Sequence, residues 1–313
     1  MSVNKNPDIV AIGHLCMDRI FLCEHMPQEN TSAHIVSHSQ QPGGTACQAI
    51  VAASRLGAST GYMSPLGDDD AGRELYAGCV KEGIDMRLCR VDNGMSSHFT
   101  NVIVNLERDT RTFFSYHSPF APLEFNDAER EYIKNAKIIH LDNTRNDNAL
   151  AAARIARENG VLVSLDASSL SPDSEKNWEL AALADIIIAA DKYPRRMTGL
   201  SDPREAILAV ARRISARIFI VTNGGEGCIL YKDGELIPYP SYAVTPIDTT
   251  GAGDAFHGAF LFGMLKGFDL DYNIRFSSAV AAQNCLAVGG RAGLPGYAQT
   301  LEFMRNNSFS GAN

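Results

Sequence analysis

From residue 136 onward the chain repeats one pattern, in which short apolar runs alternate with longer amphipathic or alanine-rich segments. The short runs predict buried strands and the longer segments predict helices. The predicted strands are residues 137–141, 161–166, 185–190 and 218–223, and the predicted helices are residues 148–159, 178–183 and 203–216. This alternation predicts a parallel sheet with helices on both faces, and sites beyond the carboxyl ends of its strands.

Nearer the N-terminus, a strand and a helix of the same kind are predicted. Residues 8–13 read as a short buried strand that ends in a glycine. The glycine pair Gly43 and Gly44 precedes an alanine-rich helix that stops at Gly57. We expect the alanines to allow close packing on the sheet, and the glycines to expose the helix N-terminus to a ligand.

A second pattern, typical of β-structure with one solvated face, separates these regions. Residues 31–39 alternate, and residues 97–105 and 110–117 are β-rich runs joined as in a hairpin. We therefore predict a small β-sheet lid apart from the main α/β body. The lid is predicted to comprise residues 15–40 and 96–118, and the body residues 1–14, 41–95 and 119–313.

Composition restricts the class of protein. The 313 residues are 45% hydrophobic and 20% charged, which is typical of a globular protein. The formal charge of −8 and the lack of a basic block argue against nucleic acid as a partner. Apolar runs are too short to span a membrane, and the first ten residues lack an apolar signal core. Seven cysteines without a CxxC pair indicate reduced thiols, so we expect a cytoplasmic protein.

The most informative stretch is DTTGAGDAFHGAF, residues 248–260. A small-residue loop, Gly251–Gly253, opens an apolar helix, and its free amides with the helix dipole form an anion site. Asp254 follows at once, and we expect the dipole to keep this carboxylate ionised. An ionised carboxylate beside a phosphate can act as a general base. The structural alternative is a glycine-rich turn before a core helix.

The stretch closely resembles the C-terminal signature of the ribokinase-like (PfkB) sugar kinases. The resemblance implies a three-layer αβα sandwich with a mostly parallel central sheet and a small β-sheet lid. It also implies that Asp254 is the catalytic base, and that the amides of Gly251, Ala252 and Gly253 form the anion hole. The lid would cover the sugar and provide the surface of a homodimer.

Further motifs extend the resemblance to the sugar site. Gly43, Gly44 and Gln48 resemble the family's GGxxxN signature, with glutamine where asparagine is usual. In the family an aspartate at the spacing of Asp18 binds sugar hydroxyls; the structural alternative is an ion pair, for example with Arg19. Thr100 and Arg111 of the predicted lid face either the substrate or solvent. Arg145 either pairs with Asp142 or binds an anionic substituent.

Nucleotide-binding residues are predicted in the same way. The stretch TNGGEG matches the family's T-x-G-x-x-G phosphate motif, while Val244 and Ile247 are expected beside the adenine. Asp248 and Thr250 match a monovalent-cation site, so K⁺ is a candidate. The N-x-x-E motif that organises Mg²⁺ is missing, which leaves Asp191 or Lys192 to replace it. The predicted ATP-binding residues are Asp191, Thr222, Gly224, Gly225, Gly227, Thr249, Gly251 and Gly253.

Together these features predict a kinase that transfers the γ-phosphoryl group of Mg-ATP to a hydroxyl, expected to be primary, of a sugar or sugar derivative. The expected partners are therefore ATP and a small sugar. The alternatives are a non-catalytic sugar-binding regulator and a nucleoside kinase of the same family. Aromatic residues of the predicted lid, such as Phe113, are compatible with a nucleoside.

Overall fold

The computed structural model describes residues 6–108 and 110–309. Its centre is an eight-stranded sheet in the order β14-β13-β12-β11-β10-β9-β1-β4. The strands from β12 to β4 are parallel, and β13 and β14 form an antiparallel edge. The strands are β1 Ile9–Ile12, β4 Thr60–Met63, β9 Ile138–Asp142, β10 Leu162–Ala167, β11 Ile186–Ala190, β12 Ile218–Thr222, β13 Cys228–Lys232 and β14 Glu235–Tyr239.

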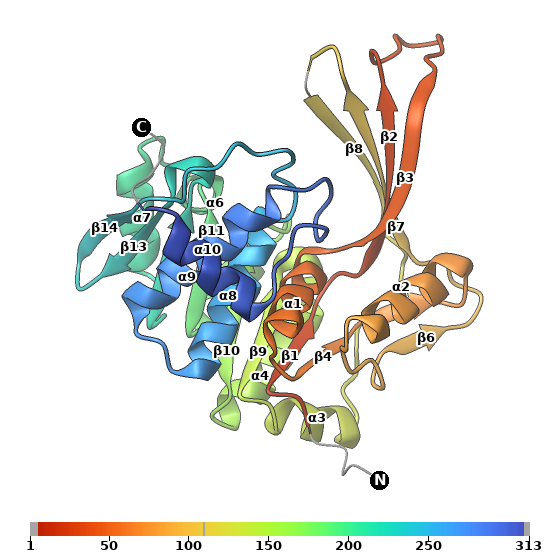
Figure 1. Ribbon diagram of the computed structural model, residues 1–313. Helices are drawn as coiled ribbons and strands as arrows, with labels where there is room; N and C mark the ends of the chain where they lie inside the picture. Colours follow the sequence, from red (N-terminus) through yellow and green to blue (C-terminus); the bar gives the residue numbers. More distant parts are fainter. Residues whose placement is uncertain (1–5, 109, 310–313) are drawn as a thin grey trace.

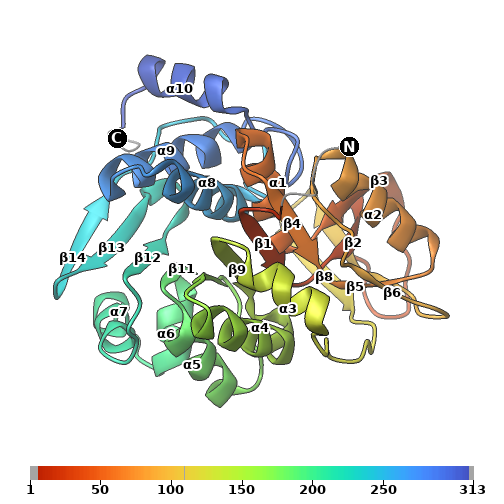
Figure 2. The same cartoon turned by 90° about the horizontal axis from the view of Figure 1, so that it is seen from below.

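Helices cover both faces of this sheet (Figure 2). Successive strand residues point to opposite faces, so Ile9 and Ala11 join one buried core while Val10 and Ile12 join the other. One face carries α1 Thr45–Leu56, α8 Ala252–Lys266, α9 Leu270–Asn284 and α10 Tyr297–Asn306; the other carries α3 Asp127–Lys134, α4 Asn146–Glu158, α5 Ser174–Leu183, α6 Lys192–Thr198 and α7 Pro203–Ala211. The predicted three-layer αβα architecture is confirmed.

A separate four-stranded sheet projects from the body beside α1 (Figure 1). Its order is β3-β2-β7-β8, with β7 and β8 paired as the predicted antiparallel hairpin. The strands are β2 Cys16–Cys23, β3 Ile35–Gly43, β7 His98–Asn105 and β8 Thr110–Tyr116. We call this sheet the lid. Strand β3 runs three residues past the predicted lid segment, which ends at residue 40, and the next residue but one begins α1.

Between the lid and the body lie α2 Asp70–Lys81 and a two-stranded parallel pair, β5 Pro65–Gly67 and β6 Arg90–Asp92. The Asp69 side chain caps α2 by accepting a hydrogen bond from the Gly72 amide at 2.8 Å. It also accepts hydrogen bonds from the amide and hydroxyl of Ser97, directly before β7. Asp69, in the segment GDDDAG at residues 67–72, therefore fixes the root of the lid to α2.

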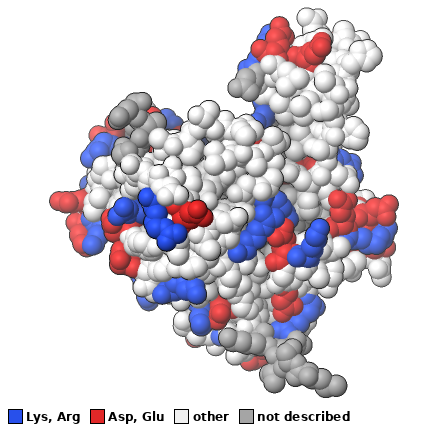
Figure 3. Space-filling model, in the orientation of Figure 1, with Lys and Arg blue, Asp and Glu red and all other residues white. Residues whose placement is uncertain are grey.

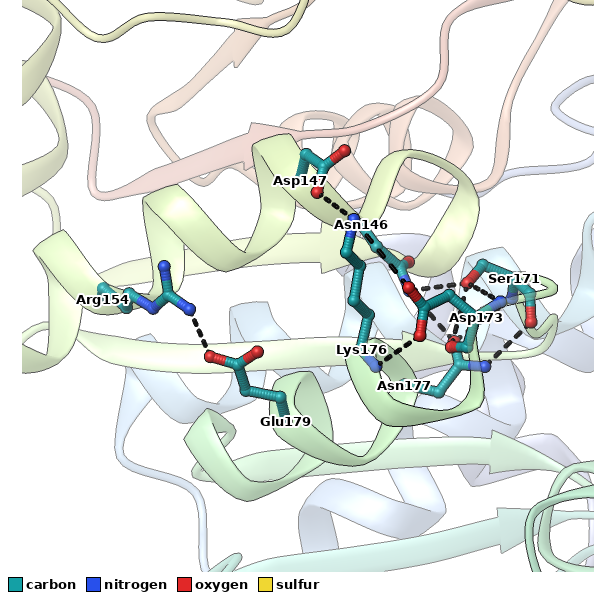
Figure 4. A network of polar contacts seen from close by, with 8 residues as sticks. All are labelled: Asn146, Asp147, Arg154, Ser171, Asp173, Lys176, Asn177 and Glu179. Carbon is teal, nitrogen blue, oxygen red and sulfur yellow. Dashed lines mark hydrogen bonds and ion pairs between the residues drawn. The ribbon is translucent and has the colours of Figure 1, made fainter.

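Some helix bounds differ from the predictions because capping residues, rather than apolar periodicity, set them. Asp173 accepts an amide hydrogen bond at the N-terminus of α5, which starts four residues before the predicted residue 178, and Asp269 does the same at the N-terminus of α9. Arg212 caps α7, which ends five residues before the predicted limit of 216. Polar residues between α4 and α5, drawn in Figure 4, include an ion pair of Lys176 with Asp147 at 2.6 Å.

Charged side chains are distributed without an extended region of one sign on the face shown in Figure 3, where Lys and Arg lie among Asp and Glu. The upper part of the body beside the lid is largely uncharged on this face. None of the helices in residues 6–108 and 110–309 is long and apolar enough to cross a membrane.

Candidate active site

The N-terminus of α8 is the centre of the candidate site. Gly251 precedes the helix in the left-handed region, with φ of 73°. A Cβ at this position would lie 2.3 Å from the Gly290 carbonyl oxygen, so both the backbone angle and the close approach require glycine. By contrast, a Cβ at Gly253 would meet open space. The turn at Gly253 therefore borders an open region that suits an anion, while the Ala252 amide donates a hydrogen bond of 3.3 Å to the Thr249 carbonyl oxygen.

A cavity of about 420 Å³ adjoins this turn. Its lining contains six of the predicted nucleotide-binding residues, namely Thr222, Gly224, Gly225, Gly227, Thr249 and Gly253. Val244 also lines it, as predicted for the adenine side, whereas Ile247 is 65% exposed and does not. Asp191 and Gly251 lie outside the lining. The loops after β12 and before α8 thus form one compartment.

The family resemblance predicts a helix over residues 275–288 near the adenine, and helix α9 does supply a wall of the cavity, together with the segment after β14. Ser278, Ala281, Ala282 and Cys285 line the cavity and recur at helical spacing along one face. A face of small residues can signal room for a flat ligand, but small residues equally signal close helix packing. Ala252, predicted for the anion hole, also lines the cavity, and the lining residues that were not predicted include Ser241, Tyr242, Ala243, Pro246 and Phe256.

Asp18 lies in the lid, on the face that turns toward the body. In the register of the sheet, Asp18 pairs with Gln41 and Thr100, and Thr100 pairs with Ser115. These side chains share one face and form a polar row across all four strands. Thr100 Oγ1 and Ser115 Oγ lie 3.1 Å apart. The row offers several hydroxyl, amide and carboxylate groups to a polar ligand.

The alternative role for Asp18, an ion pair with Arg19, does not occur. The Arg19 guanidinium lies 4.4 Å from the centre of the Phe99 ring, and both residues point to the opposite face of the lid. Burial raises the pKa of Asp18, although the Cys16 thiol and the charge of Arg291 act in the other direction. A Cβ on Gly43 would lie 2.2 Å from Asp18 Oδ2, so glycine is needed for this close approach.

Gln48 is buried in the first turns of α1, and its amide oxygen is already engaged. Arg291 Nε donates a hydrogen bond of 2.8 Å to Gln48 Oε1, and Arg291 Nη2 donates one of 2.8 Å to the Pro42 carbonyl oxygen. Arg291 therefore ties the loop after α9 to the segment that carries Gly43 and Gly44. Sequence reasoning did not single out Arg291, because its partners lie 243 and 249 residues away.

Asp142 ends β9 and holds the start of the β1–β2 connection. Its Oδ2 accepts the His14 amide at 2.8 Å, and its Oδ1 accepts the Thr144 amide at 2.9 Å. Arg145 ends the short 3₁₀ turn Asn143–Arg145, and its side chain lies outside the described part of the structure. The prediction of a partner for Arg145 therefore stays open.

The protonation of Asp254 differs from the sequence expectation. Burial raises its pKa well above the usual range, and the negative charges of Asp166, Asp142 and Asp18 add to this effect. The helix dipole was expected to keep the carboxylate ionised, but a dipole contributes only about 0.3–1 kcal/mol at an exposed helix end. Burial among several acidic groups outweighs it. Asp254 is thus a carboxyl group poised to hold a proton in the protein alone.

Asp248 and Thr250, the predicted cation site, contact the lid. Arg111 of β8 donates to Thr250 Oγ1 at 2.6 Å and lies 3.3 Å from Asp248 Oδ1. Burial alone would raise the pKa of Asp248, but hydrogen bonds from Thr250 and Gly289 and the charge of Arg111 bring it below its usual value. The guanidinium therefore already supplies positive charge to these two side chains.

The end of β11 lacks the acidic group that the N-x-x-E motif would provide. Ala190 ends the strand, and Tyr193 is 2% exposed inside α6. Asp191 lies 3.9 Å from Arg195, and Lys192 is exposed. Neither lines the large cavity beside α8. The structure therefore provides no direct support for Asp191 as a nucleotide ligand.

Comparison with known proteins agrees with this geometry. Residues 6–296 match the family described as pfkB family carbohydrate kinase. Fructokinase-1 of Oryza sativa subsp. japonica is 29% identical over 320 residues, covering 95% of this chain and 98% of that protein. Ribokinase of Haemophilus influenzae is 28% identical over 304 residues, with 95% and 98% covered. The chain therefore belongs to the pfkB family of carbohydrate kinases.

A solved structure gives the same picture of the fold. Arabidopsis thaliana ribokinase complexed with ribose and ATP superposes with a TM-score of 0.86 and 22% sequence identity, covering 95% of this chain and 98% of that chain. The predicted ribokinase-like fold is thus confirmed. The protein is an ATP-dependent carbohydrate kinase.

Proposed function

We propose that Asp254 is the general base, and that it removes the proton of a sugar hydroxyl as the hydroxyl oxygen attacks the γ-phosphorus of ATP. The supporting observation is its position in the first turn of α8. Ala252 and Gly253 of this turn line the nucleotide cavity, and the charges of Asp18 and Asp142 act on Asp254 from the lid and from β9. Asp254 therefore lies next to the residues that line the nucleotide cavity and near acidic groups of the lid and of β9, where phosphoryl transfer requires a base.

The amides of Gly251, Ala252 and Gly253 form the proposed anion hole for the transferred phosphoryl group. Amides fixed by a helix need no reorganisation as negative charge develops, which favours the transition state. ATP then occupies the cavity beside α9, with the Thr222–Gly227 turn at its phosphates. In this proposal Mg²⁺ is bound chiefly by the phosphate oxygens and water, because no carboxylate replaces the missing motif at the cavity.

The proposed acceptor is a small neutral sugar with a primary hydroxyl. Asp18, Gly43, Gly44, Gln48 and Thr100 form its binding surface. An acidic or phosphorylated sugar would need a cation in this region. Two nearby guanidinium groups are engaged, Arg111 by Asp248 and Thr250, and Arg291 by Gln48 and the Pro42 carbonyl. The fructokinase and ribokinase relatives carry names of neutral sugars, which supports the same class.

A substrate panel tests the acceptor. ADP release is measured with ketohexoses, pentoses, sugar acids, sugar phosphates and nucleosides at equal concentration. We expect the highest kcat/KM with a neutral sugar and little activity with sugar phosphates. A nucleoside that exceeds every free sugar would overturn the sugar assignment, and activity with no compound would favour a sugar-binding regulator.

The substitution Asp254→Asn tests the base with the best substrate of that panel. Asparagine keeps the size of the side chain but removes the basic oxygen. A positioned base contributes about 10²–10⁴-fold, so kcat should fall by at least ~10²-fold, with little change in the affinity for ATP and sugar. Asp271, at the start of α9, offers a matched control, because Asp271→Asn should leave kcat unchanged. A kcat near the wild-type value for Asp254→Asn would make this residue structural.

A further inference from the structure

A second group of titratable side chains lies in the interior between α8 and the sheet. His140 comes from β9, Asp166 from β10 and His257 from α8, so three separate elements meet here. Their exposed fractions are 0%, 1% and 4%. One ligand atom from each residue lies within 4.8 Å of the others. We call these residues the buried triad. The proposed phosphoryl transfer uses none of them.

The triad has the donor atoms and spacing of a metal site. His257 Nε2 lies 3.6 Å from Asp166 Oδ1. Ligand atoms of a tetrahedral ion lie ~3.3 Å apart when each metal–ligand bond is about 2.0–2.1 Å long. One of the three pairs is therefore already close to the spacing of ligands around an ion, and the other pairs lie within 4.8 Å. Two imidazoles and one carboxylate are ligands suited to a divalent transition metal, whereas Mg²⁺ and Ca²⁺ prefer oxygen ligands.

Hydrogen bonds from neighbouring residues hold two side chains of the triad in place. Metal ligands in proteins are usually oriented by hydrogen bonds of this kind. His140 Nδ1 lies 3.1 Å from Ser164 Oγ, which leaves Nε2 as the ring atom available to an ion. Asp166 Oδ1 accepts the Ser168 amide at 2.8 Å. These contacts hold one imidazole and the carboxylate in place from residues that lie outside the triad.

The triad is incomplete without a further partner. Within the described residues, His140 Nε2 is buried without a hydrogen-bond partner, although one ligand atom of this ring lies within 4.8 Å of ligand atoms of Asp166 and His257. An unsatisfied buried polar group costs about 1–3 kcal/mol, so this atom calls for a compensating group.

We propose that His140, Asp166 and His257 bind a divalent transition metal ion of the zinc class in the interior of the fold. The ion joins β9, β10 and α8. Its ligand His257 belongs to α8, the helix whose N-terminal turn lies at the nucleotide cavity. It is distinct from the Mg²⁺ that accompanies ATP, because its ligands include nitrogen atoms and its site is closed to solvent. This inference does not depend on the assigned sugar or on the role of Asp254.

A second histidine group provides the internal control. Ligand atoms of His14, His98 and His117 also lie within 4.8 Å of one another, but His117 is exposed. His98 Nδ1 accepts the Ser118 amide at 2.8 Å, and one ring atom is thereby occupied. His117→Gln therefore removes a histidine from a competing cluster without touching the buried triad.

The experiment uses the full chain without a histidine tag, unfolded and refolded in buffer that contains either Zn²⁺ or a chelator, because the closed site must be loaded during folding. Metal content is measured by mass spectrometry after gel filtration, and thermal stability by differential scanning calorimetry. We expect about one bound Zn²⁺ per chain and a higher midpoint after refolding with Zn²⁺. A metal content close to zero after refolding with Zn²⁺ would overturn the proposal.

Variants then locate the ion. His140→Gln and His257→Asn should each reduce the bound Zn²⁺ at least tenfold and abolish the metal-dependent rise in the midpoint, while His117→Gln should retain both. Loss of zinc in His117→Gln alone, or in none of the variants, would overturn the assignment. If the triad variants are insoluble, X-ray absorption of the cobalt-loaded wild type decides. Two imidazoles with one carboxylate support the triad, and three imidazoles overturn it.

Discussion

Asp254 shows how one side chain can have competing influences on its charge. It lies at a helix N-terminus, which favours an ionised carboxylate, but burial and neighbouring acidic groups favour the protonated form. In the protein without ligands, burial and neighbouring negative charge outweigh the helix dipole and favour the protonated form.

The rate of the reaction should therefore fall at acid pH. Since the base must lose its proton, kcat/KM for the sugar should fall as the pH drops through the raised pKa of Asp254. We expect this acid limb at a higher pH than the usual range of aspartate, about 3.9. The measurement is a pH–rate profile at saturating Mg-ATP, with protein stability checked at each pH. A rate that stays constant down to the pH of acid unfolding would contradict the raised pKa.

The same shift has a consequence for stability. A carboxyl group with a raised pKa binds more protons in the folded state than in the unfolded state, so it lowers stability as the pH rises through that interval. Asp254→Asn should therefore unfold at a higher temperature than the wild type at neutral pH. The gain should shrink as the pH falls toward ~4, where the wild-type side chain is also uncharged. Equal or lower stability at neutral pH would show that the charge is well compensated.

Among the elements, the lid strand β8 carries the contact that joins the lid to the anion loop. Arg111 is 41% exposed at its side chain, and pairs of this kind contribute only about 0.2–1 kcal/mol. Such a contact can form and break readily, which suits a lid that opens for substrate and product. It also places a positive charge where a monovalent cation is proposed to bind.

We expect Arg111→Gln to change the response to salts. With the guanidinium removed, Asp248 and Thr250 can bind a cation more freely, so the stimulation of kcat by K⁺ over a bulky organic cation should increase. The measurement compares KCl, NaCl and tetramethylammonium chloride at constant ionic strength. Arg108→Gln, in the turn before β8, is the control for loss of charge and should respond like the wild type. Equal rates in all three salts for both the wild type and Arg111→Gln would exclude the proposed cation site.

Much of the element order could be predicted, because buried parallel strands and alanine-rich helices have strong periodic signals. The cap residues Asp173 and Asp269 could also have been found from sequence. Strands β13 and β14 were missed because the edge of a sheet mixes polar and apolar positions. In the site, motifs located Asp254 and Gly251, but the link from Arg291 to Gln48 depends on tertiary packing across 243 residues. The local sequence around Arg291 therefore does not reveal this hydrogen bond.

At the scale of the whole molecule, the outer parts of the lid remain available to a partner. Phe114 is 57% exposed and Tyr116 is 41% exposed, and both lie in β8, an edge strand with unpaired backbone groups. Exposed aromatic side chains on an edge strand are typical of an interface. We propose that two copies of the chain associate through their lids, as expected from the family resemblance.

Phe114→Glu tests this association. A charge in the middle of an apolar contact should weaken a dimer, because the carboxylate would have to be desolvated. Light scattering coupled to gel filtration should show the wild type at twice the chain mass of 33.9 kDa and the variant shifted toward the single-chain mass. Leu200→Glu, which is exposed on the body, should leave the mass unchanged. A wild type that is monomeric at micromolar concentration would refute the lid dimer.

Strand β3 passes without a linker from the tip of the lid to Gly43, and α1 begins two residues later. A rotation of the lid must therefore shift the glycine pair at the proposed sugar site, and a sugar that fixes this pair must restrict the lid. The consequence is an order of events. Sugar would enter first and hold Arg111 at the anion loop, and only then would the phosphates of ATP meet a site that stays complete. Product-inhibition kinetics should accordingly show a compulsory sequence of binding, with the sugar as the leading substrate.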